Sequence, residues 1–482
     1  MKINVKKIRR MALMLSLLMV FTVVLAACPN LDEVPEVDPE DVVGDTSGLG
    51  NESSDVELIT PDGATDAPVV TDIVNIAPYT VAISGTCEAG ATIRVSGGEE
   101  DVETVANGTY FIIEADLLYK KNLLKVTAQA EDKDVSLERE VIASYNATAD
   151  TLLDGNSVSV GAGSRLYFDK MVADASGDNL YTASQLKDIQ NYVNDTVTSY
   201  YQDRAGAQPV ELIYVLVPNV TTIYPEIFPE GVVGEHYTTV YDQVLTTLGN
   251  TQATVVDMRA IFQGLRDDAT VNETYGGLYR VTDSSLTDYG AYLTYNEIMK
   301  KVAVNFPDAA PRAVEEFDWE KVTAKGGNLV NFRQLNGDVI NEDIVVAAPK
   351  FSLSLGTNSA GSSSIASLRK YADAENGDYN FFTASNTEDG VNGIAERWLV
   401  DTAREDVDLP NAIIYRDYSS LSFSDLLLER FEKTLLVASG EHTINLSAAG
   451  QYAAEGKNAV DYIIVVISEE NMDTAFNTAL SN

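Results

Sequence analysis

The sequence of 482 residues contains only two histidines and two cysteines. Such a shortage argues against a Cys/His zinc site and against a disulfide framework. Any mechanism that needs an imidazole base is restricted to His236 or His442. Basic residues are also scarce, since 33 Lys and Arg stand against 73 Asp and Glu and give a formal net charge of -40. Because that field repels phosphate, the composition predicts no nucleic-acid partner.

The first 27 residues have the pattern of an export signal. Five basic residues precede an apolar run from Met11 to Val24, which is too short to be interpreted first as a membrane span. The next residues, Leu25-Ala26-Ala27-Cys28, resemble a bacterial lipobox, in which Cys28 receives the lipid. We therefore predict a signal peptide over residues 1–27 and an exported, membrane-anchored lipoprotein at the bacterial cell surface. An ordinary signal peptide with an incidental cysteine is the alternative.

Residues 28–76 form a strongly acidic segment. Between Pro29 and Asp72 the chain has thirteen acidic residues and no Lys or Arg. Repulsion between like charges and a shortage of large apolar side chains keep such a segment extended. We interpret it as a disordered tether between the membrane and the folded part, with a specific acidic recognition tail as the alternative. The remaining cysteine, Cys87, is expected to be a small buried hydrophobe.

Residues 77–148 carry short runs that are typical of β-strands. These runs cover residues 79–84, 91–95, 109–113, 123–130 and 136–145. Their alternation and close spacing predict a small all-β sandwich. The segment from Ile83 to Val95, with Asn107-Gly108-Thr109-Tyr110-Phe111 further on, resembles the bacterial immunoglobulin-like repeats of surface proteins. That resemblance implies a spacer module, with ligand binding as the alternative.

After Asp150 helical patterns alternate with continuous apolar runs. The expected strands cover residues 210–217, 253–257, 411–415 and 462–467, and the expected helices cover residues 184–201, 238–248 and 423–431. Continuous apolar strands suit a sheet that is buried on both faces. The pattern predicts an α/β/α, flavodoxin-like domain with a mainly parallel sheet over residues 160–482.

Ligands bind beyond the carboxyl ends of the strands in such a sheet, so the residues after each strand are the candidates. Four stretches stand out, at residues 217–229, 279–295, 415–420 and 466–471. From them we assign Asn219, Tyr224, Glu226 and Arg416 as candidate binding residues. Tyr224 and Glu226 equally suit simple loop packing.

In this order the four stretches resemble the alginate O-acetyltransferase (AlgX/AlgJ) and DHHW-type branch of the SGNH hydrolase-like superfamily. The resemblance extends from about Ser164 to the C-terminus. It rests on the Pro-Asn-x-x-x-Ile-Tyr-Pro-Glu stretch from Pro218, an Asp-x-His-Trp position before Gly290, the turn at Arg416, and the closing strand. It implies a triad in which Asp and His assist a Ser that attacks an acyl group and passes acetyl to a sugar hydroxyl.

The chain departs from this family pattern at the residues that would perform the chemistry. Asp283 matches the family Asp, but Ser285 stands at the His position and Leu286 at the Trp position. Asp417 matches the Asp of the nucleophile turn, and Tyr418 occupies the Ser position. A serine without a base is a weak nucleophile. The sequence therefore predicts a catalytically degenerate domain in which no residue is assigned a catalytic role.

An active enzyme is the alternative hypothesis. Ser419 lies one residue past the expected nucleophile, and a triad rearranged around Ser419, Asp417 and His442 would make the chain a polysaccharide O-acetyltransferase or esterase. Neighbouring residues of a strand-to-helix turn point in different directions, so a one-residue slip would misplace the hydroxyl. A third hypothesis is a structural, adhesin-like protein whose crevice is filled by Tyr418 and Leu286.

We predict no metal ion and no cofactor. Acidic pairs such as Asp267-Asp268 and Glu315-Glu316 lack a twelve-residue calcium loop, and the Gly-rich stretch at residues 356–364 lacks the ending of a phosphate loop. Asp283 also suits a capping role at a helix expected near Thr287. The leading hypothesis is a non-catalytic lipoprotein that binds cell-surface polysaccharide or an envelope protein in cell-envelope or exopolysaccharide processing.

Overall fold

The computed structural model describes residues 51–53, 58–146, 158–198, 210–229, 232–233, 238–333, 340–351, 355–357, 396–402, 407–417, 424–438 and 460–480. The predictions for Cys28, His236, Tyr418, Ser419 and His442 concern residues outside these ranges. The described residues belong to one compact unit, Gly50–Asn482. Among them we find no helix with the length and apolar character that a membrane crossing requires.

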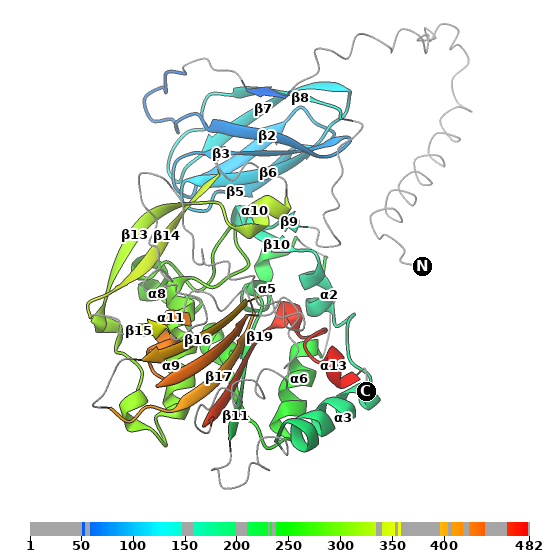
Figure 1. Cartoon of the computed structure of the whole chain (residues 1–482). Coiled ribbons are helices and arrows are strands. Elements are labelled where there is room, and N and C mark those ends of the chain that lie inside the picture. Colours follow the sequence, from blue (N-terminus) through cyan, green and yellow to red (C-terminus); the bar gives the residue numbers. More distant parts are fainter. Residues whose placement is uncertain are drawn as a thin grey trace, which may run out of the picture. The chain divides into compact units, whose positions relative to one another are not determined.

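Two antiparallel sheets share a core in the first part of this unit (Figure 1). One has the strand order β1 (Glu52–Ser53), β8 (Arg139–Ser144), β7 (Lys121–Gln129), β4 (Thr92–Ser96) and β5 (Val102–Val105). The other has the order β2 (Val69–Ala77), β3 (Thr80–Thr86) and β6 (Tyr110–Asp116). Side chains that face inward, such as Val81, Ile93 and Phe111, are fully buried. The five expected strands correspond to β3, β4, β6, β7 and β8.

Strand β1 and all of β2 except its last residue, Ala77, lie within residues 28–76, where the composition predicts an extended tether. β2 pairs with β3 along its length. Its Val70 and Ile73 pack against the sandwich core, and Ile76 is buried. The segment is acidic on average, but β2 itself is rich in β-branched residues, which favour a strand. The folded part therefore begins before residue 77.

A mixed sheet lies at the centre of the second part (Figure 1). Its described strands have the order β12 (Thr254–Asp257), β11 (Glu211–Val217), β19 (Tyr462–Ser468), β17 (Asn411–Arg416), β18 (Lys433–Ala438), β16 (Glu396–Thr402) and β15 (Leu355–Thr357). The first five are parallel, and β16 runs antiparallel to both of its neighbours. Four of these strands were expected from their continuous apolar runs, whereas β18, β16 and β15 were not.

Helices cover both faces of this sheet. The even-numbered residues 212–216 of β11 pack with α3 (Ala183–Asn191) and α6 (Val240–Gly249). The odd-numbered residues 213–217 pack with α7 (Met258–Leu265) and α9 (Asp288–Val302). Because side chains of a strand alternate between its two faces, a strand that is apolar at every position must be covered on both sides.

Shorter elements complete the second part and carry several residues of the site. They are β9 (Val158–Val160), β10 (Leu166–Phe168), α2 (Lys170–Ser176), α5 (Val220–Ile223), α8 (Ala269–Thr274), β13 (Phe317–Lys325), α10 (Asn328–Phe332), β14 (Asn341–Pro349), α11 (Ser424–Leu428) and α13 (Asn477–Leu480). Strands β13 and β14 pair antiparallel with each other.

Candidate functional site

Three adjacent parallel strands end at the same edge of the sheet. β19 lies between β11 and β17, and Val217 at the end of β11 pairs with Ser468 at the end of β19. Asn219, Asp417 and Glu469 follow these neighbouring strand ends. Open α/β sheets bind their ligands at this edge. The structure therefore brings Asn219 and Asp417 to the edge where the sequence predicted a site.

Asp417 is held against the end of β19. Its Oδ2 accepts hydrogen bonds from Ser468 N at 2.6 Å and from Ser468 Oγ at 2.5 Å. Asn471 Nδ2 donates to Ser468 Oγ at 2.8 Å. Arg416, a predicted binding residue, is 5% exposed and donates from Nη1 to Asp417 O at 3.2 Å. The Asp417 carboxylate therefore links two strand ends inside the protein.

Asn219 connects the end of β11 to two buried carboxyl groups. Its backbone N–H donates to Glu469 Oε2 at 2.8 Å, and its Nδ2 donates to Asp174 Oδ2 at 2.8 Å. Thr222 Oγ1 donates to the same Glu469 oxygen at 2.6 Å. Burial raises the pKa of Glu469 to about 7 and the pKa of Asp174 to about 6, although these hydrogen bonds lower both values. Asn219 therefore connects the end of β11 to α2 and to the residue that follows β19.

Glu470 has the most strongly perturbed carboxyl group of this edge. Burial, with the charges of Asp417, Asp174 and Asp283, raises its pKa to about 8, and Lys170 acts in the opposite direction. Its Oε2 has no hydrogen-bond partner among the described residues. A neutral carboxyl group tolerates such a position far better than a carboxylate. The surroundings of Glu470 therefore favour its protonated form.

Asp283 organises the loop in front of α9. Its Oδ1 accepts from Ser285 N at 2.9 Å, and its Oδ2 accepts from Asn328 N, at the start of α10, at 2.9 Å. A Cβ atom at Gly327 would lie 2.2 Å from Asp283 Oδ2, so glycine allows this close approach. The helix expected near Thr287 is present as α9, but Thr287 itself caps it. Asp283 holds the start of α10 instead.

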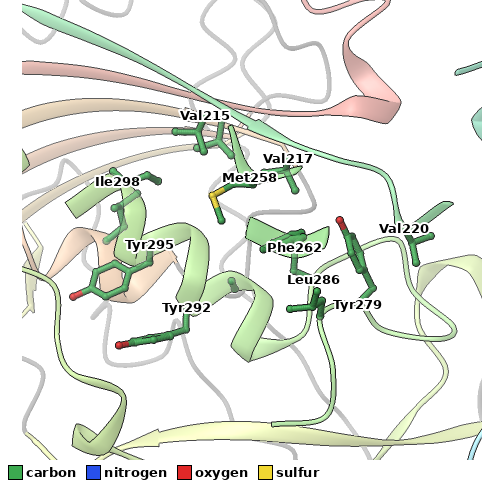
Figure 2. Close-up of a cluster of buried hydrophobic side chains, with 14 of the residues drawn as sticks. Val215, Val217, Val220, Met258, Phe262, Tyr279, Leu286, Tyr292, Tyr295 and Ile298 are labelled. Atoms are coloured by element: carbon green, nitrogen blue, oxygen red, sulfur yellow. The ribbon is translucent and has the colours of Figure 1, made fainter. Parts of the chain in front are cut away.

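The two residues that depart from the family motif are packed inside the protein. Ser285 is 5% exposed, and its carbonyl oxygen accepts from Arg280 N at 3.2 Å. Leu286 is 1% exposed and belongs to the buried cluster that contains Phe262 and Tyr279 (Figure 2). Ser285 and Leu286 are thus interior residues of the fold.

Tyr224 and Glu226, both predicted to bind ligand, share a contact with Arg266. The guanidinium lies 5.1 Å from the Tyr224 ring centroid, and its Nη2 is 2.5 Å from Glu226 Oε1. The Tyr224 ring also meets the Tyr279 ring edge to face, with 6.3 Å between centroids. These contacts agree with the loop-packing alternative, and a binding role for the two residues stays a prediction.

Sequence reasoning did not select Asp174 or Glu470. Asp174 lies on α2, three residues after the buried Met171, so an acidic residue on the apolar face of a short helix was the available signal. Glu470 lay within the candidate stretch 466–471, but two adjacent acidic residues are typical of a solvated surface. Within the described residues, no group of three or more His, Cys, Asp or Glu side chains could hold a metal ion.

Comparison with protein families agrees with the motifs. Residues 172–342 match the family model described as "SGNH hydrolase-like domain, acetyltransferase AlgX". This segment contains Asp174, Asn219 and Asp283, whereas Asp417 and Glu469 follow it. The resemblance inferred from the motifs is confirmed: over these residues the chain is similar to the SGNH hydrolase-like domain of AlgX.

Several solved structures are also similar to this chain. Bacillus cereus PatB1 with a sulfonyl adduct is 13% identical, covers 66% of this chain and 97% of its own, and has a TM-score of 0.45. A DHHW family protein from Eubacterium siraeum is 12% identical, covers 74% of this chain and 95% of its own, and has a TM-score of 0.40. The O-acetyltransferase domain of Pseudomonas putida AlgJ is 15% identical, covers 66% of this chain and 92% of its own, and has a TM-score of 0.38. A search among curated proteins finds no match.

Proposed function

We propose that the SGNH hydrolase-like domain of this chain binds glycan, or a partner enzyme, in cell-envelope or exopolysaccharide processing without turning the glycan over. The observation that carries the proposal is the residue at the histidine position of the family pattern, Ser285, which is 5% exposed. In the family pattern the residue that corresponds to Asp283 orients a histidine, and here the Asp283 carboxylate accepts from the amides of Ser285 and Asn328. Ser285 stands at that histidine position and offers no imidazole.

A hydroxyl group needs a base to become an acyl acceptor. The serine must lose its proton as it attacks the acyl carbon, and in the family pattern the histidine takes that proton. Removal of a triad member commonly lowers the rate by roughly four to six powers of ten. A domain in which the His and Ser positions hold Ser285 and Tyr418 is therefore expected to bind without reacting.

An ester hydrolysis assay tests this proposal. The purified full chain is incubated with a chromogenic acetyl ester and, separately, with an acetylated polysaccharide. We expect a rate equal to that of the Ser419→Ala variant and of buffer. A rate above buffer that Ser419→Ala abolishes, and that the neighbouring control Ser420→Ala leaves intact, would establish the rearranged enzyme instead.

The sandwich is proposed to be the immunoglobulin-like spacer that the sequence resembles. Two antiparallel sheets around a shared core support this assignment. With a lipid on Cys28 and an acidic tether after it, such a spacer would hold the SGNH hydrolase-like domain away from the bilayer.

A further inference from the structure

Three separate segments of the sandwich meet at one end. Leu117 N donates to Tyr79 O at 2.7 Å, and Tyr145 N donates to Lys120 O at 2.7 Å. These bonds join the turn between β2 and β3, the loop between β6 and β7, and the residue after β8. The side chains of these segments therefore form one surface.

Exposed aromatic rings dominate this surface. Tyr79 is 44% exposed, Leu118 is 51% exposed and Tyr119 is 65% exposed. The rings of Tyr79 and Tyr145 lie 4.6 Å apart, tilted by 43°, and Lys120 Nζ lies 6.0 Å from the centroid of the Tyr145 ring. We call Tyr79, Leu118, Tyr119, Lys120 and Tyr145 the tyrosine patch. Clustered exposed aromatic residues mark a contact surface more often than scattered ones do.

The loop between β6 and β7, which carries three of the five residues of the tyrosine patch, is held by a buried side chain. Asn122 is 4% exposed, and its Oδ1 accepts from Leu118 N and from Tyr119 N, each at 3.0 Å. Its Nδ2 donates to Tyr119 O at 2.6 Å. Because the loop is already ordered, a ligand would not have to order it on binding.

The charge of the tyrosine patch is the opposite of the charge of the chain. Neither Lys120 nor the adjacent exposed Lys121 forms an ion pair with any described residue. Elsewhere on the sandwich, Lys125 pairs with a glutamate at 2.7 Å and Lys133 with another at 2.6 Å. The carboxylate next to the loop between β6 and β7 is Asp116, at the end of β6, and its Oδ1 accepts a hydrogen bond from the Thr80 hydroxyl at 2.6 Å. Two lysines without carboxylate partners, in a chain of net charge -40, are complementary to an anionic ligand.

We propose that the tyrosine patch binds an anionic polysaccharide whose sugar rings carry carboxylates. Tyrosine rings pack against the apolar faces of sugar rings while their hydroxyls bond to sugar hydroxyls. Lys120 and Lys121 supply charge-assisted hydrogen bonds to the carboxylates. An anionic bilayer also attracts tyrosine and lysine, but the only aliphatic member of the patch is Leu118, which offers little surface for insertion. The patch lies on the sandwich, so the inference does not rest on the function proposed for the other domain.

Titration of the full chain with defined polymers tests the inference. The probes are polygalacturonate as the anionic glycan, dextran as a neutral glycan, and vesicles of equal parts phosphatidylglycerol and phosphatidylcholine, all at the same salt concentration. The test variants are Tyr119→Ala and the double variant Lys120→Ala/Lys121→Ala. The matched control Lys187→Ala/Lys301→Ala removes two exposed charges from the other domain. Unchanged thermal unfolding shows that each variant is folded.

We expect polygalacturonate to bind the parent chain, and each test variant to weaken that binding about tenfold or more. The control variant should retain the affinity of the parent chain within about twofold. The inference is overturned if polygalacturonate does not bind, if dextran binds equally well, or if only the vesicles bind. An equal loss in the control variant would also overturn it, because total charge alone would then explain the binding.

Discussion

Ser285 and Leu286 occupy the positions at which the family pattern has a histidine and a tryptophan. Leu286 is 1% exposed within the core, and Ser285 is 5% exposed beside Asp283. Asp283 has a structural use, because backbone amides donate to both of its carboxylate oxygens. At the scale of single residues, these three side chains therefore contribute to the packing and hydrogen bonding of the interior, which agrees with the binding role proposed above.

The raised pKa of Glu470 leads us to expect that the stability of the domain depends on pH. Burial and neighbouring carboxylates raise its pKa from the ordinary 4.5 to about 8. Between these values the folded state binds more protons than the unfolded state, so the free energy of unfolding decreases as pH rises through this window. Glu470→Gln cannot lose a proton. We expect this variant to be more stable than the parent by about 2 kcal/mol or more at a pH of about 8.5.

Urea denaturation at several pH values measures this effect. Glu470→Gln should flatten the decline of stability between a pH of about 5 and a pH of about 8.5. The control Glu315→Gln, at an exposed position, should keep the slope of the parent chain. A Glu470→Gln variant whose slope equals that of Glu315→Gln would show that Glu470 ionises normally in the folded state.

At the scale of elements, a buried ion pair attaches the β13–β14 hairpin to the loop that carries Asp283. Arg280 Nε lies 2.7 Å from Glu342 Oε1, and the two side chains are only 5% and 4% exposed. Glu342 Oε2 also accepts from Thr282 N at 2.7 Å. The next residue of β14, Asp343, forms an exposed pair with Lys321 at 2.8 Å. One strand thus provides a buried pair and an exposed pair in adjacent positions.

These adjacent pairs give a matched prediction. Glu342→Ala removes the buried carboxylate to which the Arg280 side chain and the Thr282 N–H donate, and should lower the free energy of unfolding by about 3 kcal/mol or more. Asp343→Ala removes a solvent-screened pair and should cost less than about 1 kcal/mol. Equilibrium denaturation of both variants measures these two losses in the free energy of unfolding. Equal losses would mean that the hairpin is not anchored through Glu342.

The strands that could be predicted from the sequence are those with continuous apolar runs. β11, β12, β17 and β19 were expected because a continuous apolar run is typical of a strand that is covered on both faces. β13 and β14 were missed because their charged residues, such as Lys321 and Asp343, interrupt the apolar pattern on a partly exposed hairpin. At the site, motifs located Asn219, Asp283 and Asp417. The burial of Asp174 depends on packing between distant segments, and its place on the apolar face of α2 was the local signal for it.

At the scale of the whole molecule, the net charge bears on the predicted membrane attachment, which would depend on the lipid at Cys28. Cleavage before Cys28 would remove five of the 33 basic residues and none of the 73 acidic ones, leaving 28 against 73, or -45. An anionic bilayer repels such a chain. We therefore expect the full-length parent chain, expressed in bacteria, to partition into the detergent phase and Cys28→Ala to move to the aqueous phase. Identical partitioning of the two proteins would show that Cys28 carries no anchor.

We propose that this SGNH hydrolase-like domain has no activated serine, and intact-mass measurement after treatment with phenylmethanesulfonyl fluoride shows whether it has one. An activated serine oxygen attacks the sulfur and displaces fluoride, which adds one sulfonyl group to the protein. We predict that the full chain keeps its unmodified mass. A single adduct that Ser419→Ala abolishes and Ser420→Ala retains would contradict the account.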